Sequence, residues 1–168
     1  MEITGSDGAI YSSEDLVHKY IDMVYRLALS QTKSLDFAED ITQDVFLKFL
    51  QSDKVFESEE HVKAWLIRVT INCSKKLFLS SWFKKTVPIT EDLAEKLSFH
   101  TPEQSDAYFA VNALPQKYRT VIYLYYYEEM SIKELCALLN ASEGTIKSRL
   151  HRAREMLKIS LKGGEFDA

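Results

Sequence analysis

The sequence has few helix-breaking residues, few cysteines and no long apolar run. Its 168 residues include only 5 glycines and 3 prolines, which favours long helices with few tight turns. Cys73 and Cys136 lie far apart, without a second cysteine or a suitably spaced histidine nearby. We therefore expect two buried or half-buried free thiols in a reducing cytosol, and neither a metal site nor a cofactor.

The chain also has no segment that predicts export or membrane insertion. No apolar run approaches the roughly 20 residues that span a bilayer. The first fifteen residues are acidic and have no apolar centre, so they do not predict a signal peptide. We expect a cytoplasmic protein without direct membrane insertion.

The residues that are present predict an all-α fold with two small helical domains and a flexible linker. Hydrophobic residues make up 46% and charged residues 27% of the chain, which is typical of soluble globular proteins. Apolar residues recur at helical spacing in two blocks, separated by an acidic stretch that contains Pro88 and Pro102. The predicted organisation is a tail over residues 1–12, a domain over 13–85, a linker over 86–103 and a domain over 104–168.

Three helices are predicted in the first block. One is capped by Ser13, the second starts near Asp36 and the third near Glu60. Their expected core-facing residues are Leu16, Tyr20, Met23, Val24 and Leu27, then Ala38, Ile41, Val45 and Phe49, then Val62, Trp65, Leu66, Val69 and Cys73. A short helix around residues 93–97 of the linker is also conceivable.

The second block ends in a helix-turn-helix pattern. Pro115 suits the first turn of a helix that continues through Tyr125. Ser131 and Glu134 have the spacing of a capping box, and the helix that follows has an apolar face made by Ile132, Leu135, Cys136 and Leu139. Asn140 and Ala141 form the turn, and Ser142 caps the last helix.

Charge is segregated along the chain. The formal net charge is −4 and the sequence pI is about 5.6, yet residues 61–85 contain six Lys or Arg and no Asp or Glu. The last helix is basic too, whereas residues 36–60 are strongly acidic. Two basic surfaces on an acidic chain predict two nucleic-acid contacts and a different partner for the acidic face.

The last helix has the features of a DNA-recognition helix. Ile146, Leu150, Ala153 and Leu157 are spaced to pack inward, and Gly144 leaves room for a phosphate backbone. The side chains left to face outward are Thr145, Lys147, Ser148, Arg149, His151 and Arg152. Such a helix fits the major groove, where Arg and Lys pair with guanine edges. The alternative is a solvated basic face on an ordinary helical hairpin.

Residues 114–157, "LPQKYRTVIYLYYYEEMSIKELCALLNASEGTIKSRLHRAREML", resemble region 4 of the sigma-70 family. "DFAEDITQDVFLKFL" resembles region 2.2, and "HVKAWLIRVTINCSKKL" resembles regions 2.3 and 2.4. Order, spacing and the lack of regions 1.1 and 3 resemble the extracytoplasmic-function (ECF, group 4) sigma factors. The resemblance implies a bacterial sigma factor that binds core RNA polymerase and directs initiation at specific promoters, controlled by an anti-sigma factor that could hold it at the membrane.

The resemblance also implies roles for particular residues. The residues matched to docking on the clamp helices of the largest polymerase subunit are Asp36, Glu39, Asp40, Gln43 and Asp44; the second domain would meet the flap of the second-largest subunit. Arg68, Asn72, Lys75 and Lys76 match the minus-10 segment, and the outward residues of the last helix match the minus-35 segment. Many relatives have aspartate where this chain has Lys76, so an unusual minus-10 preference is expected. Trp82 and Phe83 have no assigned role.

Two other classes of function fit parts of the sequence. A free-standing transcriptional regulator would use the helix-turn-helix, but the resemblance of the first block to region 2 would then have no explanation. An enzyme that cleaves nucleic acid would need paired carboxylates near basic residues, and the acidic helix lacks metal-ligand spacing. We expect no catalytic residues in the chain.

Overall fold

The computed structural model of the chain describes residues 1–79 and 105–161. The chain divides into two compact units, Met1–Pro88 and Ile89–Ala168. The described residues are mainly helical, as predicted. The expected linker, the conceivable helix at residues 93–97, and Trp82 and Phe83 lie outside the described residues. Among the described helices, none has the length and apolar character needed to cross a bilayer.

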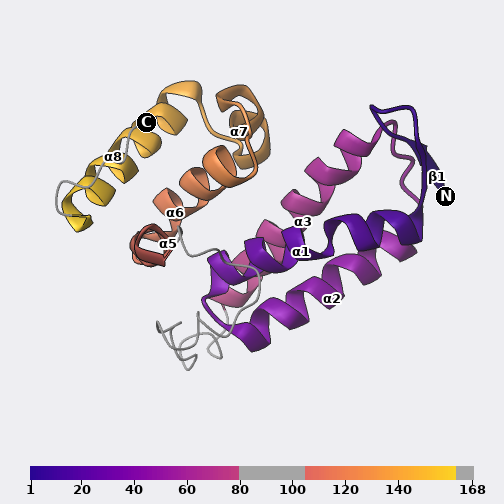
Figure 1. Ribbon diagram of the computed structural model, residues 1–168, viewed down its shortest axis with the longest axis horizontal. Helices are drawn as coiled ribbons and strands as arrows, with labels where there is room; N and C mark the ends of the chain where they lie inside the picture. The colour runs from indigo at the N-terminus through magenta and orange to yellow at the C-terminus, as the bar shows by residue number, and fades with distance from the viewer. Residues whose placement is uncertain (80–104, 162–168) are drawn as a thin grey trace. The chain divides into compact units, whose positions relative to one another are not determined.

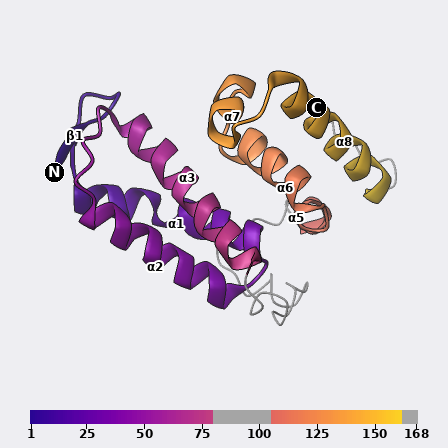
Figure 2. The same cartoon turned by 180° about the vertical axis from the view of Figure 1, so that it is seen from behind.

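The first unit is a bundle of three helices, α1 (Ser13–Thr32), α2 (Leu35–Gln51) and α3 (Glu59–Phe78). Each helix packs on the other two (Figure 1, Figure 2). A serine caps the start of each one: Ser12, Ser34 and Ser58 accept hydrogen bonds from backbone amides of the first turn. The predicted stripes of α1 and α2 are all buried, whereas Trp65 and Val69 of α3 are half-buried.

Residues 1–12, expected to be a tail, form a β-hairpin instead. Strands β1 (Glu2–Thr4) and β2 (Ile10–Ser12) pair antiparallel, with Ile3 opposite Tyr11. Asp7 closes the turn by accepting hydrogen bonds from the Ala9 amide at 2.9 Å and the Tyr11 hydroxyl at 2.8 Å. The buried side chain of Ile3 anchors the hairpin. Strands of three residues are too short to show a repeating pattern in sequence.

The second unit contains α5 (Ser105–Asn112), α6 (Gln116–Ile122), η3 (Tyr123–Tyr127), α7 (Ile132–Leu139) and α8 (Glu143–Ser160). Helices α6 and α8 lie side by side (Figure 1, Figure 2). The helix expected to continue through Tyr125 changes at Tyr123 into the π-helical turn η3. Within that turn the Tyr126 hydroxyl accepts a hydrogen bond from Arg154 Nε at 2.9 Å, a contact between residues 28 positions apart that no local pattern reveals.

Candidate functional site

The helix-turn-helix forms as the sequence predicts. Ser131 and Glu134 make the reciprocal capping box at the start of α7. Asn140 ends α7 in the left-handed conformation with φ of 51°, which asparagine adopts more easily than most residues. Ser142 then caps α8 by accepting a hydrogen bond from the Thr145 amide at 3.2 Å. These local contacts fix the direction in which α8 leaves the turn.

The inward stripe of α8 is completely buried, and this decides which side chains face out. Ile146, Leu150, Ala153 and Leu157 are each no more than 1% exposed. Of the predicted minus-35 residues, Lys147, Ser148, His151 and Arg152 are exposed, whereas Thr145 and Arg149 are half-buried. Four of the six therefore face solvent, and Thr145 and Arg149 flank the buried stripe.

The charges of α8 are not equally available. Lys147 Nζ lies 2.6 Å from Glu143 Oε1, and this contact raises the pKa of Lys147 and lowers that of Glu143. For Arg149 and Arg152, no ion pair with a carboxylate is found in the part of the chain that the structure describes. Their guanidinium groups are therefore ready for an external acceptor.

Four of the predicted residues line one groove, together with two residues that the sequence analysis missed. The groove has a volume of about 740 Å³ and is lined by Lys117, Tyr118, Ser142, Gly144, Thr145, Ser148, Arg149 and Arg152. Lys147 and His151 are not among its lining residues. Lys117 and Tyr118 belong to α6, about 30 residues before α8 in the chain, so only the packing of α6 on α8 brings them to this surface.

Buried Arg119 holds the start of α6 in place. Its Nη1 donates a hydrogen bond to the Leu114 carbonyl oxygen at 2.7 Å. Burial lowers the pKa of Arg119 to about 10, so the side chain remains charged at neutral pH. Because Arg119 ties α6 to the turn before it, Lys117 and Tyr118 project from a fixed backbone.

The predicted docking residues all lie on the exposed side of α2. Asp36, Glu39, Asp40, Gln43 and Asp44 are exposed. Leu47 and Leu50, which the sequence analysis missed, are 54% and 57% exposed. At 100° per residue they fall on the same side of α2 as Gln43. We call these seven residues the α2 face. Leu47 and Leu50 lie outside the buried stripe of α2, and this position in the sequence could have predicted the apolar end of the face.

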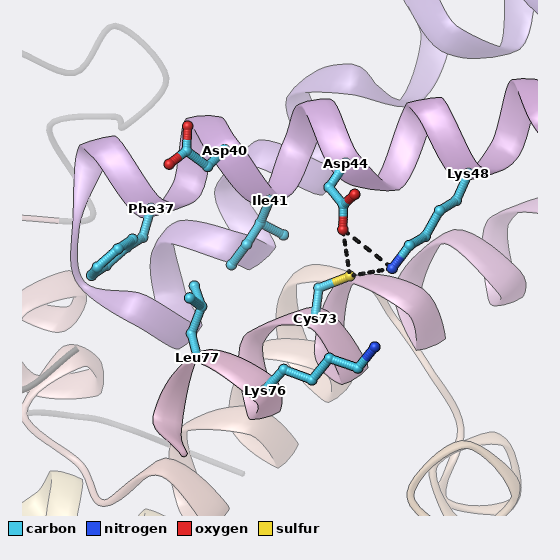
Figure 3. Close-up of a pocket in the computed structure, with 8 residues that line it drawn as sticks. All are labelled: Phe37, Asp40, Ile41, Asp44, Lys48, Cys73, Lys76 and Leu77. Carbon is cyan, nitrogen blue, oxygen red and sulfur yellow. Dashed lines mark hydrogen bonds and ion pairs between the residues drawn. The ribbon is translucent and has the colours of Figure 1, made fainter. Parts of the chain in front are cut away.

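Asp44 differs from the other acidic residues of the α2 face because it is already engaged. Its Oδ2 pairs with Lys48 Nζ at 3.2 Å and accepts a hydrogen bond from Cys73 Sγ at 3.5 Å (Figure 3). Lys48 Nζ in turn lies 3.6 Å from Cys73 Sγ. Burial raises the pKa of the Cys73 thiol, which keeps it protonated and unreactive at neutral pH. Both cysteines are free thiols, as predicted.

The side chains around Cys73 line an open pocket of about 350 Å³ between α2 and α3 (Figure 3). Its lining residues are Phe37, Asp40, Ile41, Asp44, Lys48, Cys73, Lys76 and Leu77. The pocket therefore brings Asp40 and Asp44 of the α2 face beside Lys76 of the predicted minus-10 set. Within the described ranges no cluster of metal-ligating side chains is found.

The predicted minus-10 residues lie along one exposed side of α3. Arg68, Asn72, Lys75 and Lys76 are all exposed, and their spacing of three and four residues places them on adjacent turns. Trp65, three residues before Arg68, is half-buried and packs on Phe49 and Phe56, with ring centroids 6.0 Å and 5.6 Å away. Trp65 therefore serves the core, as expected.

Comparisons with known proteins match both parts of the chain to one family. Residues 16–83 match the family model of sigma-70 region 2, and residues 106–157 match that of sigma-70, region 4. The ECF RNA polymerase sigma factor SigM of Bacillus subtilis is 32% identical over 163 residues, covering 92% of this chain and 98% of SigM. The ECF RNA polymerase sigma factor SigW of the same organism is 30% identical over 168 residues, covering 88% of each chain.

Two solved structures share the fold. The sigma factor RpoE in complex with the anti-sigma factor NepR from Bartonella quintana has a TM-score of 0.64 and 23% identity, covering 90% of this chain and 98% of that one. CnrH in complex with the cytosolic domain of CnrY has a TM-score of 0.64 and 22% identity, covering 91% and 89%.

Proposed function

The chain belongs to the ECF RNA polymerase sigma factors. We propose that three exposed faces of the protein have separate roles in promoter-specific initiation. The protein binds core RNA polymerase and directs it to promoters. The α2 face docks on the polymerase, the exposed side of α3 holds the minus-10 element, and α8 reads the minus-35 element.

One observation carries the minus-35 assignment: Arg149 and Arg152 line a groove on a helix-turn-helix whose lining contains no carboxylate. Arginine forms bidentate hydrogen bonds with guanine O6 and N7 in the major groove, worth about 1–3 kcal/mol of discrimination per base. Lys147 and His151, outside the groove, are placed to contact flanking phosphates or bases. Ser148 and Thr145 add hydroxyl groups to this surface. A hydroxyl group can form a hydrogen bond with a phosphate or with a base.

The α2 face suits a protein partner better than DNA, because it is acidic and has an apolar end. Acidic and amide groups give register and on-rate against a basic partner helix, and exposed leucines supply apolar area. We assign this face to the clamp helices of the largest polymerase subunit, and a surface of the second unit to the flap of the second-largest subunit.

The exposed side of α3 combines positive charges with a side-chain amide, and these are the groups needed to bind a DNA strand that has separated from its complement. Arg68, Lys75 and Lys76 supply cations for phosphates, and Asn72 has donors and an acceptor for a base edge. None of these groups needs chemistry of its own, since the polymerase forms the phosphodiester bond. The protein acts in the cytoplasm as a specificity subunit without catalytic activity.

Control by an anti-sigma factor is part of the proposal, supported by the sigma factor RpoE, which shares the fold and was solved in complex with the anti-sigma factor NepR. A partner that covers both units would block docking and DNA contact together. Affinity purification of the tagged protein from unstressed cells should recover an anti-sigma factor; recovery of polymerase alone would speak against this control.

Run-off transcription tests the central assignment. The purified chain is added to core RNA polymerase and promoter fragments, and specific transcripts are expected. Arg149→Ala with Arg152→Ala should reduce transcription from a minus-35-dependent promoter, while Lys158→Gln, which removes one positive charge near the end of α8, should not. Unchanged transcription with the double variant would refute the minus-35 role. DNA binding without polymerase would indicate a free-standing regulator, and strand cleavage a nuclease.

A further inference from the structure

We infer that Glu143 is a specificity-determining residue of the minus-35 contact, and that together with Lys147 it selects a C·G base pair. The carboxylate of Glu143 accepts a hydrogen bond from cytosine N4, and the ammonium of Lys147 donates to O6 and N7 of the paired guanine. The inference rests on the proposed function, in which α8 lies in the major groove. It adds to that function an acidic residue that the sequence analysis did not assign to DNA.

Glu143 lies at the end of α8 that a helix-turn-helix presents to base edges. It is the first residue of the helix, and recognition helices contact bases mainly through their N-terminal residues. Its neighbours in the chain, Ser142 and Gly144, both line the groove. The side chains of Glu143 and Lys147 are each more than half exposed. A base edge that reaches Lys147 therefore also meets the carboxylate.

The carboxylate of Glu143 suits a base rather than a phosphate. The ion pair with Lys147 lowers the pKa of Glu143, so the group is ionised at neutral pH and can only accept hydrogen bonds. A phosphate of the DNA backbone is negatively charged and repels it. In the major groove the hydrogen-bond donors are the amino groups of cytosine N4 and adenine N6. These two bases are therefore the available partners of Glu143.

Lys147 distinguishes between the two bases. Its Nζ lies 2.6 Å from Glu143 Oε1, so the ion pair presents a donor and an acceptor side by side. Cytosine N4 and guanine O6 of one base pair are also adjacent, because they are hydrogen-bonded to each other at about 2.9 Å. Guanine offers the ammonium a second acceptor, N7, whereas thymine O4 lies beside a methyl group. The ion pair therefore matches C·G better than A·T.

The alternative role of Glu143 is to stabilise α8. An acidic residue in the first turn interacts favourably with the helix dipole, and an ion pair between residues four apart adds to this. A structural role predicts that loss of the carboxylate weakens binding to every sequence by one factor, whereas base recognition predicts a loss confined to one base pair. The matched control is Glu155 on the same helix, which pairs with Lys158 at 3.7 Å and is also more than half exposed.

The experiment uses the full chain assembled with core RNA polymerase. Each base pair of the minus-35 element is replaced in turn by the other three, and fluorescence anisotropy gives the affinity for each labelled duplex. Wild type should prefer C·G at one position by at least about fivefold, the lower end of what one base contact contributes. Glu143→Ala should remove this preference and keep those at the other positions. Glu155→Ala should keep them all.

Two further variants test the roles of the carboxylate and the ammonium separately. Glu143→Gln should shift the preference at that position toward A·T, because glutamine pairs with adenine N6 and N7. A shift of preference cannot arise from unfolding, so this variant keeps the test decisive even if Glu143→Ala is less stable. Lys147→Ala should change the preference at the same base pair, and its combination with Glu143→Ala should lose less than the sum of the single losses.

The outcomes separate the inference from the proposed function. If wild-type holoenzyme binds all the duplexes equally, the proposed function fails. If wild type has preferences but Glu143→Ala and Glu143→Gln keep all of them, only the inference is overturned. It is also overturned if wild type nowhere prefers C·G, or if both variants weaken every duplex by one factor, which would leave Glu143 with the structural role.

Discussion

Gly144 is a single residue at which the needs of folding and of DNA binding oppose each other. Among the residues that the structure describes, an ideal Cβ at this position would meet only Ser142 Oγ, at 4.0 Å. The protein's own packing therefore gives no reason for glycine, which costs a helix about 0.5–1 kcal/mol relative to alanine. Gly144 lines the groove, so the reason for glycine at this position is the room that it leaves for a bound phosphate backbone.

Gly144→Ala should consequently raise stability and lower promoter affinity. We expect a gain of up to about 1 kcal/mol in the free energy of unfolding, measured by circular dichroism during denaturation. The added methyl group should weaken binding of the holoenzyme to a promoter duplex with an intact minus-35 element, measured by fluorescence anisotropy of the labelled duplex. A stabilised variant with wild-type affinity would show that no backbone approaches this residue.

Glu59 is a buried carboxylate at the start of α3, only 6% exposed. It pairs with Lys19 and accepts a hydrogen bond from the Tyr20 hydroxyl at 2.6 Å. Burial alone would raise the pKa of Glu59, but the hydrogen bonds from Lys19 and Tyr20 outweigh burial and lower the pKa below 4.5. Since the folded state favours the ionised form, Glu59 stabilises the fold above about pH 4.5, and this contribution is lost as the pH falls through the lowered pKa.

Glu59→Gln should therefore destabilise the first unit in a pH-dependent way. We expect a loss of about 1–3 kcal/mol at pH 7, and the difference from wild type should shrink as the pH falls below about 4.5. Both tryptophans belong to the unit Met1–Pro88, so urea denaturation followed by tryptophan fluorescence reports on it. Exposed Glu60→Gln removes a charge from the same helical turn and should cost less than about 0.5 kcal/mol; equal losses would contradict the assigned role of Glu59.

At the scale of elements, local signals predicted the helices well. The capping box of α7, the cap at Ser142 and the buried stripe of α8 follow from residues within a few positions of one another. The start of α1 was placed one residue late, because Ser12 and not Ser13 provides the cap. Spacing also indicated which residues of α2, α3 and α8 face out.

What the sequence could not reveal depends on contacts between distant residues. The hairpin is anchored by the burial of Ile3, and the turn η3 by Arg154. The engagement of Asp44 by Cys73 crosses 29 positions, and Lys117 reaches the groove only because α6 packs on α8. Periodicity describes one helix at a time, so it does not report which helix completes a site.

The apolar end of the α2 face can be tested without disturbing the core. Leu47 and Leu50 are more than half exposed, so Leu47→Asn with Leu50→Asn should change the free energy of unfolding by less than about 0.5 kcal/mol per residue. If they contact polymerase, affinity for the core enzyme should fall at least about tenfold, or about 1.4 kcal/mol. Biolayer interferometry with immobilised core enzyme measures the loss.

Two further variants accompany that measurement, one as a second test of the α2 face and one as a control. Asp40→Lys with Gln43→Lys reverses the charge of the same face and should also weaken the complex. Val55→Asn, in the loop between α2 and α3, alters a side chain that is 82% exposed but lies off the α2 face; it should bind like wild type. Wild-type affinity of both double variants would remove the α2 face from the docking surface.

The whole molecule carries opposite charges in different places. A formal net charge of −4 gives weak long-range attraction to phosphate, although α3 and α8 each present a basic face. Each face belongs to a different unit and holds only a few cations. When both units are docked on one polymerase, the first DNA contact makes the second one intramolecular. The overall affinity for the promoter then exceeds that of either contact alone, although no new contact is formed.

Duplex promoter DNA should therefore bind the free protein poorly and the holoenzyme tightly, and Asn72 should matter only after the strands separate. Its exposed amide suits a base edge, but a base stacked within the duplex cannot reach it. Asn72→Ala should leave binding of the holoenzyme to closed promoter DNA nearly unchanged in gel-shift titrations, yet reduce the thymines that permanganate detects as unpaired. Equal melting by variant and wild type would make Asn72 a bystander on α3, and tight promoter binding by the free protein would contradict the dependence on docking.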